Sequence, residues 1–395
     1  MSKLSPESGF SGFSGFSGFS GFSGFSGFSG FSGFSGFGDP GAPIVADALI
    51  RQRDGVAGQW QTPALTPTHL GFDDPANMAR WEPRIRAFII DFEVASRIAF
   101  TATATGGVEK ACMWHLVPGG TATAPTGTYK PLLDATRADE EFYKRQLDFI
   151  DRYADLRADR ASEILAQLPG GLAFLAAVPY VHPDRTPRTL ELLDAAMRLA
   201  QHVEMRVKHA LACRRSHEYS PQIQPMILTP GHPSTPSGHS TESFTMAIVL
   251  WMLLRDSGTS PYGDVLWGDQ LLRIASRVAV NRTVAGVHFP VDSATGCVMG
   301  LTLGQYFVNR CTGAANYQAW SFDGTKFPDI AAGNGPPLDG DFYWRELYDV
   351  DAKPYPVQTP TTAPNDYATS GGSQPLGSPS PILQWLWNKA KAEWT

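Results

Sequence analysis

Pro236-Ser-Gly-His239 and Arg282-Thr-Val-Ala-Gly-Val-His-Phe-Pro-Val-Asp292 are the two stretches that decide what this chain folds around. The first combines a hydroxyl, a glycine that lets backbone N–H groups approach a ligand, and an imidazole. We expect a helix to begin there, and a helix N-terminus attracts anions. The second places a guanidinium before His288, and a carboxylate that can orient the His288 ring after it. Together they predict a binding site for a tetrahedral oxyanion.

A third segment adds two cations. Thr186-Pro187 opens a predicted helix on which apolar residues recur at helical spacing as far as Leu211. Lys208 and Arg215 are separated by nearly two helical turns, so we expect both to leave one face of this helix, about 10 Å apart. From there they would hold opposite sides of one small anion.

In their order along the chain, Lys208-x6-Arg215, Pro236-Ser-Gly-His239 and Arg282-x5-His288-x3-Asp292 resemble the three signatures shared by vanadium-dependent haloperoxidases and type 2 phosphatidic acid phosphatases. The sequence departs from this pattern at Ser216, where many members have Pro, and at Asn281, where Ser is common. Neither departure removes a cation, so both bear on the subfamily more than on the site.

The resemblance implies a role for each motif residue. The oxyanion would be bound by Lys208, Arg215, Ser237, the Gly238 amide, Arg282 and His288. His288 would be the vanadium ligand and Asp292 would hold its ring, while His239 would be the acid–base group. Lys208 would also act on bound peroxide, which makes Lys208, His239, His288 and Asp292 the predicted catalytic residues.

Two reactions are compatible with this site. The main hypothesis from the resemblance is a vanadate-dependent haloperoxidase, which uses hydrogen peroxide to oxidise halide to a hypohalous-acid equivalent that attacks a small organic substrate. The alternative is a soluble acid phosphatase with phosphate in place of vanadate. His288 would then form a phosphohistidine and His239 would protonate the leaving alcohol. A catalytically silent binding module is disfavoured because every polar group that the chemistry needs is present.

His232 bears on which halide a haloperoxidase of this kind would oxidise. It lies seven positions before His239, where bromide-oxidising relatives carry a second histidine near the metal and chloride-oxidising relatives tend to carry Phe. The resemblance therefore favours bromide or iodide over chloride. The other interpretation is that His232 is a polar loop residue between prolines.

Composition limits the class of protein. The chain has 395 residues, 43% of them hydrophobic, and a net charge of −6. It is long enough for a substantial core, and its mild acidity argues against nonspecific nucleic-acid binding.

The apolar run 246–254 is much shorter than the roughly 20 residues that a membrane span needs. No signal-peptide core follows Met1, so we expect a cytoplasmic or otherwise soluble protein, with homo-oligomerisation left open. The cysteines lack metal-ligand spacing and should be free thiols.

Apolar periodicity predicts helices over 83–103, 138–168, 241–255 and 264–283, and we find no convincing strand alternation. Gly296, Gly300 and Gly304 recur every four residues, which would let another backbone approach closely. The expected fold is all-α, a helical bundle over 77–350 of the type that the resembling family has, with the anion held between helices.

The flanking segments differ in composition. Ser-Gly-Phe recurs ten times between Ser8 and Phe37, so 1–76 should be a disordered repeat with an irregular lead-in. Residues 351–381, rich in Pro, Thr, Ser and Gly, should be a linker. The amphipathic segment 382–395 carries three tryptophans, which are costly to expose, so we expect it to fold back on the domain.

Overall fold

The computed structural model describes residues 43–329, 340–353, 355–363 and 365–395. The predicted disorder of the Ser-Gly-Phe repeat falls outside these residues. The chain divides into two compact units, with the boundary between Ala79 and Arg80. Before that boundary lies α1 (Pro43–Val56), which has no buried residue, and the 3₁₀ helix η3 (Pro75–Arg80) runs across it. The expected irregular lead-in therefore contains a helix.

The unit Arg80–Thr395 contains a sheet, so the predicted all-α fold class is wrong. The sheet has five strands in the order β1-β2-β3-β4-β7. Their bounds are β1 (Ile98–Thr105), β2 (Val108–Thr121), β3 (Ala124–Thr136), β4 (Asn316–Asp323) and β7 (Ala368–Pro375). β3 and β4 are parallel and the other neighbours are antiparallel. A second, two-stranded sheet pairs β5 (Tyr348–Asp349) with β6 (Val357–Gln358).

Two segments depart from the predicted secondary structure. The helix expected over 83–103 ends early, since α2 (Pro83–Ala95) gives way to β1. Gly106 and Gly107 then turn the chain into β2, and both have a positive φ, which glycine adopts without steric cost. In the expected linker, 351–381, the chain forms β6 and β7. β7 forms the edge of the sheet beside β4, with which its backbone pairs, although its side chains are small and mostly polar.

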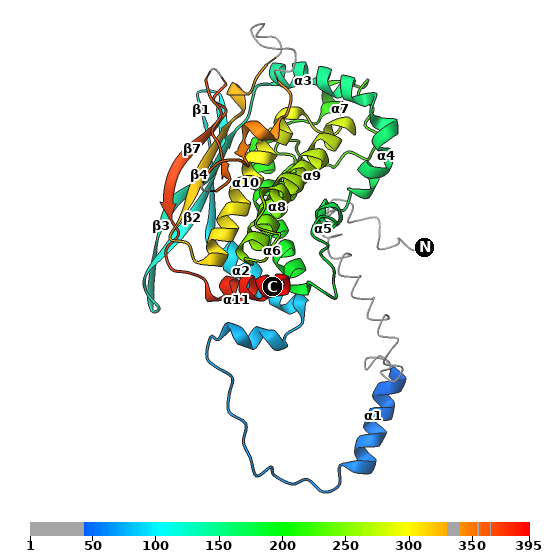
Figure 1. The fold of residues 1–395 in the computed structure, drawn as a ribbon, viewed down its shortest axis with the longest axis vertical. Coiled ribbons are helices and arrows are strands. Elements are labelled where there is room, and N and C mark those ends of the chain that lie inside the picture. Colours follow the sequence, from blue (N-terminus) through cyan, green and yellow to red (C-terminus); the bar gives the residue numbers. More distant parts are fainter. Residues whose placement is uncertain (1–42, 330–339, 354, 364) are drawn as a thin grey trace, which may run out of the picture. The chain divides into compact units, whose positions relative to one another are not determined.

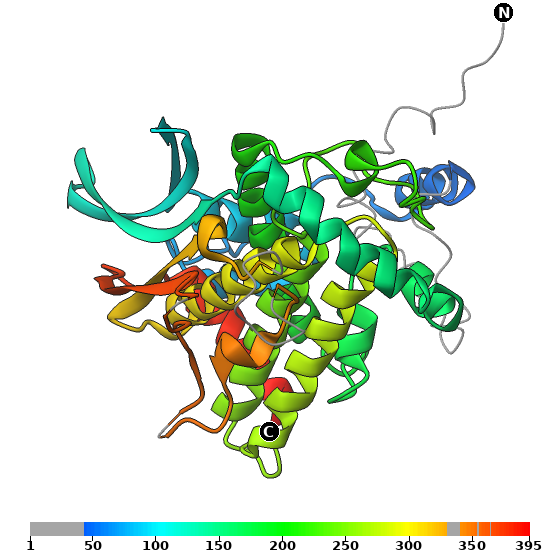
Figure 2. The same cartoon turned by 90° about the horizontal axis from the view of Figure 1, so that it is seen from above.

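Helices pack against one face of this sheet (Figure 1). Seen from above, the ends of β1–β3 project beyond them (Figure 2), and Thr101–Thr105 of β1 are exposed. The helices are α3 (Glu140–Ala154), α4 (Arg157–Ala166), α5 (Leu172–Ala176), α6 (Pro187–Leu211), α7 (Ser216–Tyr219), α8 (Gly238–Asp256), α9 (Val265–Val284), α10 (Pro290–Thr312) and α11 (Pro381–Lys391), with 3₁₀ turns at Gly324–Lys326, Trp344–Glu346 and Ala392–Trp394. The helix expected over 138–168 is therefore two helices.

Close packing of α10 on α8 depends on glycine. A Cβ added to Gly296 would lie 2.7 Å from the Ser237 carbonyl oxygen, and one on Gly300 would lie 2.5 Å from that of Thr241. Such distances are too short for real carbon–oxygen contacts. The four-residue glycine spacing thus brings two helix backbones together, as predicted, and fixes the N-terminus of α8 beside that of α10.

The C-terminal segment folds back on the same unit, as expected. Trp387 is buried in α11 and donates to Asp256 at the end of α8 over 2.7 Å. Trp394 donates to Thr189 of α6 over 2.9 Å. Glu393 accepts hydrogen bonds from the backbone N–H groups of Arg188 and Thr189, which stabilises the N-terminus of α6.

Two further expectations concern the described residues. None of the helices in the described ranges is long and apolar enough to cross a bilayer. All four cysteines, Cys112, Cys213, Cys297 and Cys311, are free, and the last three are buried.

Candidate active site

The predicted site residues come from the ends of five elements. Lys208 lies in the last turn of α6, Arg215 immediately before α7, and Ser237 and Gly238 at the start of α8. Arg282 is in the last turn of α9, His288 lies just before α10, and Asp292 is in the first turn of α10. The expectation that Lys208 and Arg215 share one helix is wrong. α6 ends at Leu211, and the left-handed backbone of its C-cap residue Ala212 (φ 51°) turns the chain before Arg215.

The His288 ring is fixed at both nitrogens. Its Nδ1 atom lies 2.9 Å from Oδ2 of Asp292, and its Nε2 atom lies 3.0 Å from Nη1 of Arg215. Because a guanidinium can only donate, Nε2 is the acceptor and Nδ1 carries the proton. Burial, with Arg215 and Lys208 adding to it, holds the pKa of His288 well below its usual range. His288 is therefore a neutral imidazole whose lone pair points toward a cation.

Asp292 is fully buried and its carboxylate accepts from several groups. Ser234 donates to Oδ2 over 2.5 Å, Thr235 donates to Oδ1, and the backbone N–H of Phe289 donates to Oδ2 over 3.0 Å. Burial raises the pKa of Asp292, and these donors oppose the shift. Asp292 thus caps α10 and orients His288 at once.

Lys208 is only 1% exposed, and its ammonium faces carbonyl oxygens. Nζ donates to Ser234 O over 2.9 Å, to Pro233 O over 3.3 Å, and to Pro236 O. Burial, followed by the charge of Arg215, lowers the pKa of Lys208 to about 7. The side chain is therefore close to half-protonated at neutral pH and anchors the loop that carries the Ser-Gly-His stretch.

Arg215 connects His288 to the loop before α8. Besides His288, Nη1 donates to Val287 O over 2.8 Å, and Nε donates to His232 O over 2.9 Å. Nη2 lies 3.1 Å from Nδ1 of His232. The structure thus places His232 against a site cation, and burial, with Lys208 and Arg215, lowers its pKa to about 4.

Arg282 is the site cation with the most unused donors. It is 1% exposed, and Nη2 donates to the side-chain oxygen of Gln167 over 3.0 Å. Nε and Nη1 are buried and have no hydrogen-bond partner among the described residues. Burial lowers the pKa of Arg282 to about 10, which leaves it charged at neutral pH. Unpaired buried donors on a charged group are costly, and an oxyanion is the partner that a guanidinium binds best.

His239 lies next to Arg282. Its Nε2 donates to the Gln167 carbonyl oxygen over 3.0 Å, so Nδ1 of the neutral ring carries the lone pair. Burial, followed by the charge of Arg282, lowers the pKa of His239 to about 3. Ser237 is buried and caps α8, where its hydroxyl accepts from Ser240 N. The first turn of α8, beginning at Gly238, faces this cluster with its positive dipole end.

One carboxyl group of the site is not indicated by the sequence, since a lone glutamate on a helix is more often part of a solvated face. Glu204 is one turn before Lys208 on α6 and 4% exposed, and its Oε2 has no partner among the described residues. Its Oε1 would lie 2.6 Å from a Cβ on Gly238, which places it against the start of α8. Burial, followed by the charge of Glu242, raises the pKa of Glu204 well above its usual value. The site thus holds, beside its cations, a carboxyl group whose charged form is disfavoured by burial.

Three positioning residues were also missed. Gln167 accepts hydrogen bonds from Arg282, Asn281 and His239. Ser234 and Thr235 donate hydrogen bonds to the Asp292 carboxylate. Ser234 and Thr235 sit in the Pro-rich loop before the Ser-Gly-His stretch, so their proximity to the motif was a usable signal. Gln167 follows α4, far from any motif, and no local pattern marks it.

The predicted cations and imidazoles are therefore together. The pKa of His288 is lowered by the nearby charges of Arg215, Lys208 and His239. The pKa of His239 is lowered in the same way by Arg282 and Lys208. The arrangement combines buried basic side chains, the imidazoles of His232, His239 and His288, and the N-terminus of α8. Chemically, it can bind a tetrahedral oxyanion and present Nε2 of His288 to its central atom.

Comparison with known proteins agrees with this class of site. Residues 204–314 match the family model of the PAP2 superfamily, a range that contains every predicted site residue. This match confirms the predicted relationship for residues 204–314, which are similar to the PAP2 superfamily, and that superfamily includes both vanadium haloperoxidases and PAP2 phosphatases. No curated protein matches the chain.

Among solved structures, the chain is similar to a transmembrane PAP2-type phosphatidylglycerolphosphate phosphatase from Bacillus subtilis. The two are 18% identical, and the alignment covers 42% of this chain and 74% of the other. The TM-score is 0.26, which is too low to support an argument about fold or function.

Proposed function

We propose that the protein is a phosphatase that hydrolyses phosphate monoesters through a phosphohistidine at His288. The observation that carries the proposal is the neutral His288 ring, whose Nδ1 is held by Asp292 and whose Nε2 faces a cation donor in a buried site. The PAP2 superfamily match over 204–314 supports the same chemistry.

The reaction begins when Arg215 moves its donor from Nε2 of His288 to a phosphoryl oxygen. The unpaired Nε and Nη1 of Arg282 bind other oxygens, as does the N-terminus of α8. Fixed donors of this kind stabilise charge that develops in the transition state. Nε2 of His288 is then in line with phosphorus.

Attack by Nε2 forms a P–N bond and breaks the P–O bond to the alcohol. The bound dianion raises the pKa of His239, so Nδ1 of this ring takes up a proton from solvent on binding and then donates it to the leaving oxygen. Water, deprotonated by the now neutral His239, attacks phosphorus and breaks the P–N bond. Phosphate leaves, His239 releases the proton that it took from water, and both rings are again neutral.

The test is trapping of the phosphoenzyme. Para-nitrophenyl phosphate is mixed with the protein and quenched in alkali, and ³¹P NMR is recorded on the denatured chain. An acid-labile, alkali-stable phosphohistidine is expected in the wild type and absent in His288→Gln. His217→Gln, which alters an exposed histidine on α7, is the matched control and should retain turnover. Full turnover in His288→Gln rules out the proposed nucleophile.

A second candidate is a vanadate-dependent haloperoxidase, and His232 favours it. The ring lies against Arg215, so it belongs to the site and not only to the loop. The site fits vanadate for the reasons that it fits phosphate: Arg282 has unpaired donors, and His288 presents a lone pair. Lys208, Arg215, Ser237, Gly238, Arg282 and His288 would hold the vanadate, which supplies activation of hydrogen peroxide for halide oxidation.

One experiment separates the two candidates. The protein is incubated with orthovanadate, and bromination of a phenolic dye with peroxide and bromide is compared with hydrolysis of para-nitrophenyl phosphate. The phosphatase proposal expects strong phosphate release that vanadate inhibits, and His232→Ala should change it less than threefold. Vanadate-dependent bromination that changes in His232→Ala, with little phosphate release, supports the haloperoxidase instead.

A further inference from the structure

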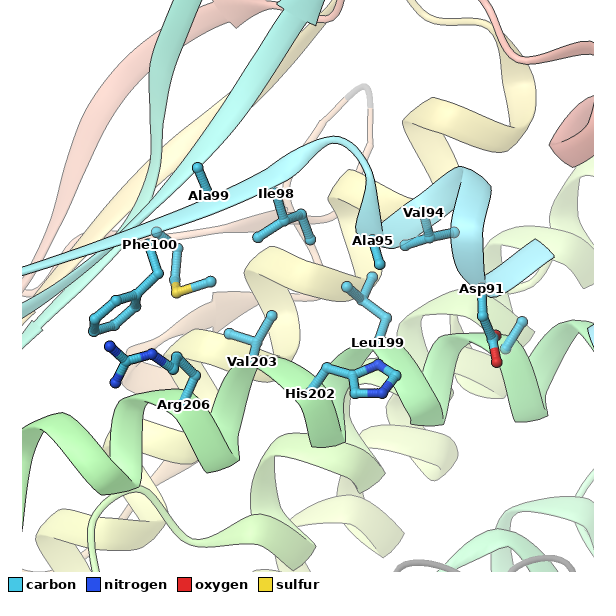
Figure 3. A pocket seen from close by; sticks show the side chains of 12 residues that line it. Asp91, Val94, Ala95, Ile98, Ala99, Phe100, Leu199, His202, Val203 and Arg206 are labelled. Carbon is cyan, nitrogen blue, oxygen red and sulfur yellow. The ribbon is translucent and has the colours of Figure 1, made fainter. Parts of the chain in front are cut away.

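A cavity lies on a different face of α6 from Glu204 and Lys208. It has a volume of about 280 Å³ and is bounded by α2, β1, β2 and α6 (Figure 3). Its walls are mainly apolar, formed by Val94, Ala95, Ile98, Met113, Leu199 and Val203. This volume is close to the lower limit of about 300 Å³ for small-molecule pockets.

The cavity is elongated along the helix. Its α6 residues run from Ala195 to Arg206, eleven positions at a rise of roughly 1.5 Å, so it extends about 16 Å. Figure 3 shows Phe100 and Arg206 at one end and Asp91 at the other, with Ile98, Leu199 and Val203 between them. An extended chain of carbon atoms matches this shape better than a compact ligand does.

Charge is distributed unequally between the two ends. Both carboxylate oxygens of Asp91 accept from the single Nε–H of Arg198, at 2.8 and 2.9 Å. Arg198 also pairs with Asp194, so this end of the cavity has two carboxylates for one cation and is net negative. Arg206 makes no ion pair with any residue that the structure describes. Its guanidinium lies 3.7 Å from the centroid of the Phe100 ring and 3.2 Å from Nδ1 of His209. The Phe100 ring holds the cation at the mouth of an apolar channel, with donors left for an anion.

The cavity is separate from the site around His288. On α6, its wall residues Leu199, Val203 and Arg206 follow helical spacing along one face. Lys208 and Glu204 leave other faces of the same helix and are buried beside α8. The unpaired cation of the cavity therefore serves a different ligand from the oxyanion.

We propose that this cavity binds an amphipathic carboxylate, a medium-chain fatty acid or a molecule of similar shape. The carboxylate pairs with the Arg206 guanidinium, and the alkyl chain lies between α2 and α6 against Val94, Ile98, Leu199 and Val203. Burying the apolar chain supplies affinity. The cation selects the anionic end. This proposal does not depend on the reaction at His288.

The first experiment compares three probes of equal length on the full chain. Octanoate, octan-1-ol and octylamine are titrated by calorimetry at pH 8, where their head groups are anionic, neutral and cationic. Octanoate is expected to bind at least tenfold more tightly than octan-1-ol, and octylamine more weakly than either. Equal affinities, or no octanoate binding up to millimolar concentration, overturn the proposal.

Variants then locate the binding. Arg206→Gln should weaken octanoate at least tenfold and leave octan-1-ol unchanged, whereas Arg152→Gln, an exposed arginine on α3, should change neither. Ala95→Trp places a bulky ring at the exposed wall and should abolish binding of both. Should this variant fold poorly, ¹³C-methyl labelling of methionine provides a second measurement. Octanoate must shift the Met113 resonance, which is identified by its loss in Met113→Leu. Binding that Arg206→Gln leaves intact, or that leaves Met113 unshifted, rejects this site.

Discussion

Nδ1 of His288 lies 2.9 Å from Oδ2 of Asp292, one helical turn further along α10. The same carboxylate accepts from Ser234, Thr235 and the Phe289 amide. The pair therefore joins the start of α10 to the loop before α8, and it sets which nitrogen of His288 carries the lone pair.

Replacing Asp292 with Asn tests this control of the tautomer. The amide keeps the shape, but its NH₂ group can face Nδ1 and move the ring proton to Nε2, which removes the nucleophile. A comparable change in serine proteases lowers kcat by about 10⁴-fold, so we expect a loss of about 10³-fold or more in kcat. Steady-state kinetics measures the loss, and ¹⁵N NMR of the histidines should show the inverted tautomer. Activity within tenfold of wild type would contradict the assigned role.

Arg282→Met should separate anion binding from stability. Loss of charge-assisted hydrogen bonds is expected to weaken phosphate binding by about 1.5–3 kcal/mol. Without anion, the variant should unfold at the same temperature as wild type or higher, because two unpaired buried donors and a buried charge are removed.

Arg277→Met is the matched control for that prediction. Arg277 lies on the same helix and pairs with Glu163 at the surface, where its side chain is 52% exposed. This variant should bind phosphate with wild-type affinity. The result that counts against the site is a large loss of unfolding free energy in Arg282→Met with phosphate affinity unchanged.

Lys208 should link anion binding to pH. With a pKa of about 7 in the folded protein and about 10.4 in the unfolded chain, Lys208 is protonated in both states below pH 7. Between pH 7 and about 10.4 only the unfolded chain holds the proton, so this group makes the free energy of unfolding rise with pH. A bound anion favours the charged form, so binding takes up a proton above pH 7.

Calorimetry in two buffers with different ionisation enthalpies measures this proton uptake. At pH 8.5, wild type should take up close to one more proton per bound phosphate than Lys208→Met, since titration of phosphate itself is common to both. Phosphate affinity attributable to Lys208 should fall by up to about tenfold per pH unit above 7. Equal proton uptake in the two proteins would show that Lys208 stays charged throughout.

The site could be predicted from the sequence because its chemistry lies in short motifs at helix ends. Lys208, Arg282 and His288 each belong to a motif that is defined by both residue type and spacing. Proline marks the helix starts at Pro187 and Pro290. Gln167 and Glu204 carry no such pattern. Their place in the site follows from how α4 and α6 pack against α8 and α9, which no local signal records.

The sheet was missed for two different reasons. Ile98–Thr105 alternates threonine with alanine, which has little apolar character, yet Gly106-Gly107 beyond it is a hairpin signal that was available. β7 could not have been found in this way. Ala368–Pro375 has the composition of a linker and becomes a strand only because β4, distant in sequence, offers it a free edge.

Gly300→Ala should damage the site without touching it. A Cβ at this position would lie 2.5 Å from Thr241 O and 2.8 Å from Cβ of Phe244, so α8 and α10 must move apart. We expect a cost of about 1–3 kcal/mol in the free energy of unfolding, less the gain of up to about 1 kcal/mol in helix propensity. Since α8 carries His239 and α10 carries His288, their separation should also change, and a misplacement of 1 Å can cost about 10²-fold in rate. Denaturant unfolding and kcat are measured beside Gly263→Ala, whose added Cβ meets no atom within 4 Å. The control should match wild type in both. A Gly300→Ala protein that is destabilised yet fully active would mean that the α8–α10 distance does not set the geometry of the two histidines.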